Sequence, residues 1–257
     1  MKVKDVMTIN PVFLKDTDYM THARQVMRDR HYRTVPVVDA KNRVLGILTE
    51  KELLNIYSTK SNVTVEGFTS EFPFVYPEME MMEAAKLMIE AGIGRVPVLR
   101  SGQDMTLAGI LSVVDIFRNM KVDKIPKKKL HEIMTTDVKT CSNKDHISKV
   151  WLNMKETGLS GFPVMKNGEL VGMVTRRNII NAGYARIERE DNQGTRSTMS
   201  PPVEKIMSTP AYSLSPEATL AEAIQAFLKL DVGRISITND GKLVGIVDRN
   251  DIIKAFI

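Results

Sequence analysis

The 257-residue sequence contains one cysteine, Cys141, which cannot form an internal disulfide. It also lacks any apolar run near the ~20 residues that a membrane helix needs, and its opening residues lack the apolar core of a signal peptide. The four histidines are scattered, with no spacing that suits a metal ion. These absences predict a cytoplasmic protein without a membrane segment or a metal site, in which Cys141 has a structural role.

Catalytic signatures are missing as well. We find no Ser-His-Asp arrangement and no metal motif, and the segment GILSVVDI does not have the glycine spacing of a phosphate-binding loop. The sequence therefore predicts a protein that is not an enzyme and that requires no cofactor.

The composition is that of an ordinary globular protein, with 43% apolar and 26% charged residues, and the length fits two domains. The formal net charge is +5, and part of the excess lies in KVDKIPKKKLHE, residues 121–132. A basic balance leaves nucleic-acid binding open as an alternative function. No aromatic-rich basic strand or recognition-helix motif accompanies the charge, so this alternative is not favoured.

One pattern occurs four times along the chain. Each copy has a short strand rich in Val, Ile and Leu, a polar or glycine-containing turn, a second strand that passes through a glycine, and a helix. A polar residue follows that glycine after three positions, and an acidic or amide residue follows after three more. The copies are residues 33–57, 94–120, 160–184 and 233–256, and their glycines are Gly46, Gly109, Gly172 and Gly245.

An amphipathic helix precedes each pair of strands, so the repeating unit is strand–helix–strand–strand–helix. In the fourth copy we expect Ser215 as the N-cap and Pro216 as the first helical residue. A single unit has too little core for a comfortable domain, so we expect the units to pair. The expected units are 1–60, 61–124, 125–186 and 200–257, in modules 1–124 and 125–257, with a hinge at 121–129 and a loop at 185–202.

The repeated pattern resembles the cystathionine β-synthase (CBS) domain. The stretches 3–14, 130–140 and 203–214 are similar to that domain's opening segment, whereas 65–76 departs from it because no methionine is in place. The resemblance covers nearly the whole chain and implies a mixed α+β fold of four tandem CBS units paired into two Bateman modules. This layout is similar to that of the γ subunit of AMP-activated protein kinase.

The same resemblance implies a function. Paired CBS units commonly bind AMP, ADP, ATP or S-adenosylmethionine in the clefts between them, and they regulate a partner protein. Modules of this family often assemble further, so a homodimer is one expected assembly. We therefore expect a regulatory protein that binds an adenosine ligand.

The chemistry of such a ligand indicates which residues would bind it. One ionised carboxylate can accept hydrogen bonds from both ribose hydroxyls, and Asp115 and Asp251 lie where the family places that carboxylate. A phosphate suits a helix N-terminus and an arginine, and Arg95 and Arg234 match the phosphate-binding arginine of the kinase γ type. The candidate ligand-binding residues are Arg95, Pro97, Ser112, Asp115, Arg234, Asp251, Thr49, Glu52, Thr175 and Asn178.

A capping box explains part of this pattern without a ligand, because Ser or Thr followed three residues later by Asp or Glu starts a helix well. Capping does not explain the two arginines, nor the glycines before the caps, which suggest a close backbone approach. The second copy has the fullest set of residues, whereas Asp248 in the fourth would repel a phosphate. The first copy has the longer Glu52, and the third has Asn178 and no arginine at the position of Arg95. We expect one or two occupied sites, and a scaffold with four vestigial sites is the alternative.

Overall fold

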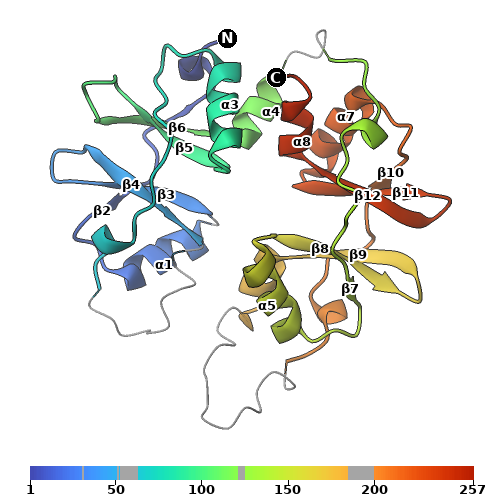
Figure 1. The fold of residues 1–257 in the computed structure, drawn as a ribbon. Coiled ribbons are helices and arrows are strands. Elements are labelled where there is room, and N and C mark those ends of the chain that lie inside the picture. Colours follow the sequence, from blue (N-terminus) through green and yellow to red (C-terminus); the bar gives the residue numbers. More distant parts are fainter. Residues whose placement is uncertain (31, 51, 53–62, 121–124, 185–199) are drawn as a thin grey trace. The chain divides into compact units, whose positions relative to one another are not determined.

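The computed structural model describes residues 1–30, 32–50, 52, 63–120, 125–184 and 200–257. The chain divides into two compact units, Met1–Val122 with Phe256–Ile257 and Asp123–Ala255, which we call the N-terminal and C-terminal halves (Figure 1). Each half contains two copies of the repeating unit, numbered repeats 1 to 4 in chain order. Most of the predicted loop 185–202 and the start of the predicted hinge lie outside the described residues. No helix within the described ranges has the length and apolar character to cross a membrane.

Each repeat contains an antiparallel hairpin of two strands, which are rich in Val, Ile and Leu as predicted. In repeats 1, 3 and 4 a two-residue strand from the same repeat pairs in parallel with the first strand of the hairpin. In repeat 2 a single bridge between Val75 and Val98 replaces that strand. The strands are β1 Thr8–Ile9, β2 Leu14–Lys15, β3 Thr34–Val38, β4 Val44–Thr49, β5 Arg95–Leu99, β6 Leu107–Ser112, β7 Cys141–Ser142, β8 Gly161–Lys166, β9 Glu169–Thr175, β10 Ser213–Leu214, β11 Arg234–Asn239 and β12 Lys242–Asp248.

The helices bury one apolar face against their sheet and, in repeats 2 to 4, contact each other in pairs. The predicted apolar face of the third repeat (Ile147, Val150, Trp151 and Met154) is at most 2% exposed, which confirms the amphipathic pattern. The helices are α1 Met20–Asp29, α3 Met81–Glu90, α4 Val113–Asn119, α5 Ile147–Thr157, α6 Arg176–Asn181, α7 Leu220–Leu230 and α8 Arg249–Lys254. Figure 1 shows α3 and α4 together beside β5 and β6, and α7 and α8 together beside β12.

The predicted start of α7 was wrong. The helix begins at Leu220 with Thr219 as its N-cap, because the Thr219 and Glu222 side chains form a reciprocal capping box. Ser215 instead begins a turn, in which its carbonyl oxygen accepts a hydrogen bond of 3.0 Å from the Ala218 amide. Pro216 therefore lies in a turn before the helix.

We call the segment that opens each repeat the lead segment (residues 3–14, 65–76, 130–140 and 203–214). It completes the sheet of the other repeat in the same half. In the N-terminal half, β1 from repeat 1 pairs with β6 of repeat 2, and Ser70 from repeat 2 bridges to Ile47 of repeat 1. In the C-terminal half, Thr135 bridges to Ile246 and Ser208 to Met173. This reciprocal exchange confirms that the repeats pair as 1 with 2 and 3 with 4.

The exchanged lead segments also explain the repeated glycines. A Cβ atom on Gly109 would lie 2.9 Å from the Thr8 carbonyl oxygen, and one on Gly172 would lie 2.8 Å from the Ser208 carbonyl oxygen. Side chains do not tolerate such contacts with backbone. The close approach that the sequence suggested is therefore real, but its partner is the neighbouring repeat rather than a ligand.

Cys141 lies on β7 and is 5% exposed. Burial raises the pKa of its thiol to about 12. The thiol therefore stays protonated near neutral pH, as its predicted structural role requires.

Candidate functional site

The fold brings three candidate residues of repeat 2 together. Arg95, the first residue of β5, pairs directly with Ser112, the last residue of β6. Ser112 then caps α4: its hydroxyl accepts from the Asp115 amide at 3.2 Å, and Asp115 Oδ2 accepts from the Ser112 amide at 2.9 Å. Pro97 follows two residues after Arg95 and is buried. A guanidinium, a hydroxyl and a carboxylate thus lie together where the β5–β6 hairpin meets the start of α4. We call this place, and the equivalent place in each repeat, the corner of the repeat.

This corner contacts the other repeat of the N-terminal half. The Arg95 guanidinium carbon lies 5.5 Å from the centre of the Tyr32 ring, which follows α1 of repeat 1. Tyr32 in turn packs against the core of repeat 1. Within the described part of the chain Arg95 makes no hydrogen bond, so its N–H groups can serve a bound anion.

Repeat 4 places the equivalent residues differently. Arg234 pairs with Asp248 across β11 and β12, and its guanidinium donates to the Gly161 carbonyl oxygen at 3.0 Å and to Ser160 Oγ at 2.7 Å. A Cβ atom on Gly161 would lie 2.9 Å from the Arg234 guanidinium, so a side chain at this position would displace the arginine. Arg234 therefore joins repeat 4 to repeat 3.

The carboxylates of repeat 4 influence each other. Asp251 Oδ2 accepts from the Asp248 amide at 2.9 Å, and Asp248 Oδ1 accepts from the Asp251 amide at 3.1 Å. Burial, followed by the charge of Asp248, raises the pKa of Asp251 to about 6. The carboxylate at this position is thus partly protonated in mild acid.

In repeats 1 and 3 the corresponding residues bond to an exchanged lead segment. Glu52 Oε1 accepts from Ser70 Oγ at 2.8 Å, and Asn178 Nδ2 donates to Ser208 Oγ at 3.3 Å. Asn178 also caps α6, since it accepts from the Thr175 amide at 2.8 Å, and Glu52 accepts from the Thr49 amide at the same distance. Sequence reasoning missed the two serines, although each directly follows a Thr or Met that lies against a repeated glycine.

The capping alternative is thus part of the structure. Capping boxes begin α4, α6 and α8, and the Thr49–Glu52 bonds have the same form. Capping alone accounts for the repeated polar spacing. It does not account for Arg95 and Arg234, which both reach the neighbouring repeat.

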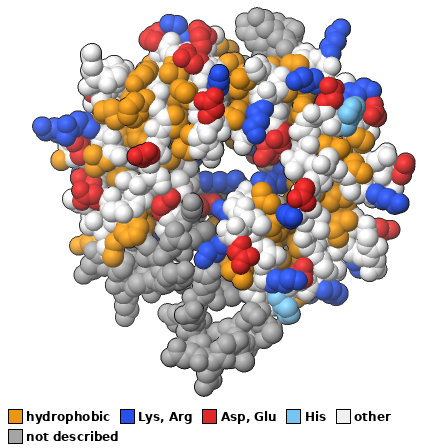
Figure 2. Space-filling view, viewed as in Figure 1, with side chains coloured by type: hydrophobic (Ala, Val, Ile, Leu, Met, Phe, Trp, Pro, Cys, Tyr) orange, Lys and Arg blue, Asp and Glu red, His pale blue; other side chains and the backbone are white. Residues whose placement is uncertain are grey.

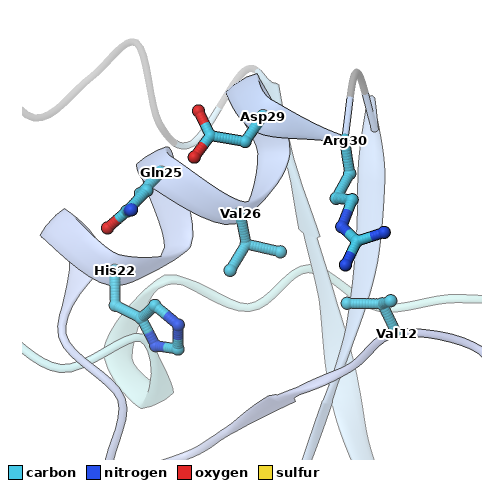
Figure 3. A pocket seen from close by; sticks show the side chains of 6 residues that line it. All are labelled: Val12, His22, Gln25, Val26, Asp29 and Arg30. Carbon is cyan, nitrogen blue, oxygen red and sulfur yellow. The ribbon is translucent and has the colours of Figure 1, made fainter.

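A separate hollow of about 260 Å³ is lined by residues of α1, by Arg30 that follows it, and by Val12. Figure 3 shows side chains from successive turns of α1 around it, with Val12 of the lead segment beside Arg30. None of the candidate ligand-binding residues lines this hollow. Its lining residues are Val12, His22, Gln25, Val26, Asp29 and Arg30.

Charged side chains are mixed on the surface that Figure 2 shows. Lysines and arginines alternate there with aspartates and glutamates instead of gathering in one basic patch. Ion pairs also occur among the described residues, such as those of Lys2 and Lys4 with Glu78. These two bonds lower the pKa of Glu78 to about 2. The mixed charge on this face does not favour the nucleic-acid alternative there.

The fold defines a class of protein built from four tandem repeats, which pair by exchanging their lead segments. The CBS domain family matches the chain four times, at residues 3–59, 65–122, 130–184 and 203–257. The chain therefore belongs to the CBS domain family.

Several similar proteins come from archaea. An uncharacterised 33.4 kDa protein of a ribosomal RNA operon in Thermofilum pendens is 26% identical over 86% of this chain and 79% of its own length. Uncharacterised protein MJ1404 of Methanocaldococcus jannaschii is 26% identical over 98% of this chain, which spans only 61% of that protein. The crystal structure of MJ1225 from the same organism, described as a proposed archaeal homologue of γ-AMPK, has a TM-score of 0.81 at 20% identity and full coverage of both chains. That likeness shows the fold.

Proposed function

We propose that this chain is a cytoplasmic regulatory protein that binds an adenosine ligand between paired CBS repeats and signals to a partner protein. The proposal assigns it no catalytic activity. The observation that carries it is the cluster of Arg95, Ser112 and Asp115 at the contact with Tyr32. We place the ligand there, in contact with both repeats of the N-terminal half.

Each residue of this cluster suits one part of a nucleotide. The second oxygen of Asp115 accepts from the ribose hydroxyls, because its first oxygen is occupied by Ser112. The Arg95 guanidinium binds a phosphate, and its contact with the Tyr32 ring holds it in place. The base lies against the backbone of β5 near Pro97.

A ligand in this position touches both repeats, so it can alter their packing. Its effect on a partner is limited by the difference in its affinity for the two packing states. The partner would detect this change at the surface of the half, and the family resemblance makes a second copy of the chain one candidate assembly.

Calorimetric titration of the full chain with AMP, ATP and S-adenosylmethionine tests the proposal. Asp115→Asn should weaken binding by about 1–3 kcal/mol, the usual cost of losing a charged hydrogen-bond partner. The variant should still fold, because Asn178 caps α6 through the same bond in repeat 3. Arg95→Ala should weaken the binding of the ligands that carry phosphate. Its control Arg100→Ala, on the exposed hairpin turn, should leave their affinity unchanged.

The absence of binding by all three ligands up to millimolar concentration would refute the proposal. That result, together with an unchanged melting temperature, would favour the scaffold alternative, because any ligand that binds the folded state raises its stability.

A further inference from the structure

The two halves present different charges at equivalent positions. Arg95 stands opposite the uncharged Ser112 in repeat 2, whereas Arg234 stands opposite the carboxylate of Asp248 in repeat 4. The comparison is direct because both pairs are register partners at the end of the same hairpin. Repeat 4 therefore carries one more carboxylate than repeat 2 beside its arginine.

The extra carboxylate is fixed in position. Asp248 Oδ1 accepts from the Asn250 amide at 2.8 Å and from the Asp251 amide at 3.1 Å. In repeat 2 a neutral hydroxyl makes the corresponding bond to Asp115. Asp248 thus holds a negative charge where repeat 2 has none.

The arginine of repeat 4 already donates hydrogen bonds to repeat 3. Its guanidinium bonds to Gly161 and Ser160, whereas the described contact of Arg95 is with a ring face. Other charges near Asp251 come from Asp248, Lys254 and Arg234, and of these the repulsion by Asp248 is the strongest. A phosphate in this corner would meet a carboxylate pair that is already mutually repulsive.

A buried hydroxyl points to a polar ligand in repeat 4. Ser236 is 0% exposed, and its Oγ has no hydrogen-bond partner in the described structure. Buried hydroxyls normally have a partner. Ser236 follows two residues after Arg234, so both side chains share one face of β11. The other three repeats have Pro36, Pro97 and Pro163 at this position of the hairpin.

Resting on the proposed function, we propose that the two halves select adenosine ligands by charge. The corner of repeat 2 binds a ligand that carries phosphate, and the corner of repeat 4 binds a nucleoside without phosphate. Asp248 is the residue that excludes the phosphate, and Ser236 hydrogen-bonds a polar atom of the nucleoside.

A reciprocal exchange of two residues in the full chain tests this selection, with AMP and adenosine as the calorimetric probes. The unmodified chain should bind one AMP. The Asp248→Ser chain should bind a second AMP, in repeat 4. Ser112→Asp should weaken the binding of AMP in repeat 2 by roughly tenfold or more, because it places a like charge beside the phosphate. Both substitutions insert a good N-cap, so the helices should persist.

Matched controls change the same charge elsewhere. Asp137→Ser, at a side chain that is 85% exposed, and Ser101→Asp, on the exposed turn between β5 and β6, should leave both titrations unchanged. Ser236→Ala should weaken adenosine but not AMP.

The outcomes separate the two proposals. An Asp248→Ser chain that still binds one AMP, or a Ser112→Asp chain that binds AMP like the unmodified protein, overturns charge selection and leaves the proposed function intact. Failure of the unmodified chain to bind either probe also overturns charge selection, whereas the proposed function is overturned only if ATP and S-adenosylmethionine fail to bind as well.

Discussion

Replacing Gly109 by alanine tests whether the exchanged lead segments hold the repeats together. The new Cβ atom would lie 2.8 Å from Met7 Sδ and 2.9 Å from the Thr8 carbonyl oxygen. The methionine side chain can move, but the carbonyl oxygen belongs to β1, which pairs with β6 at this point. We therefore expect either strain or loss of the β1–β6 pairing, at a cost of about 1–3 kcal/mol in the free energy of unfolding, as for other overpacked sites.

The effect should be local. Hydrogen exchange measured by mass spectrometry should show faster exchange in peptides that contain residues 8–9 and 109–110. The N-terminal half should also unfold at a lower urea concentration than in the unmodified chain. Two halves need not unfold in one step, so the local readout is the more direct one.

Gly94→Ala provides the control in the same repeat. A Cβ atom on Gly94 meets no atom within 4 Å, and the backbone there is not left-handed. That variant should be neutral or slightly more stable, because alanine restricts the unfolded chain. If Gly109→Ala is as stable and as protected as Gly94→Ala, our explanation of the repeated glycines is incorrect.

Two further predictions concern titrating groups. The pKa of Asp251 is about 6 in the folded protein and near its ordinary value when unfolded, so the folded state binds this proton more tightly. The resulting stabilisation should be complete below about pH 4 and lost as the pH rises through 6. Asp251→Asn should remove this part of the pH dependence of the free energy of unfolding. A variant with the same pH profile as the unmodified chain would contradict the assignment. The second group is Cys141, whose burial and pKa of about 12 should make it react slowly with a thiol reagent at pH 8 until urea unfolds the chain; rapid labelling of the folded protein would contradict its buried position.

The sequence predicted the repeating unit because local signals repeat in it. Alternating apolar strands and the amphipathic face of α5 depend on residues that are close in the chain. The start of α7 was misplaced because Ser215 and Pro216 are as good a start signal as Thr219 and Glu222. Only the completed turn at Ser215–Ala218 decides between them.

The candidate site was predictable in its residue types but not in its contacts. Arg95, Ser112 and Asp115 follow from the repeat, and their proximity follows from hairpin register. Tyr32 and Ser160 could not be found in this way, because both contact an arginine of a different repeat. Such contacts depend on how two sheets face each other, which no local pattern contains.

Reciprocal exchange of the lead segments has a consequence for biosynthesis. The strand Thr8–Ile9 leaves the ribosome first, but the strand that it pairs with, Leu107–Ser112, is made about a hundred residues later. At the usual elongation rate the first segment waits roughly 5–20 s for its partner. The smallest piece of this chain that can complete its sheets during translation is therefore a pair of repeats, and a fragment cut between repeats 1 and 2 would leave each sheet without one edge.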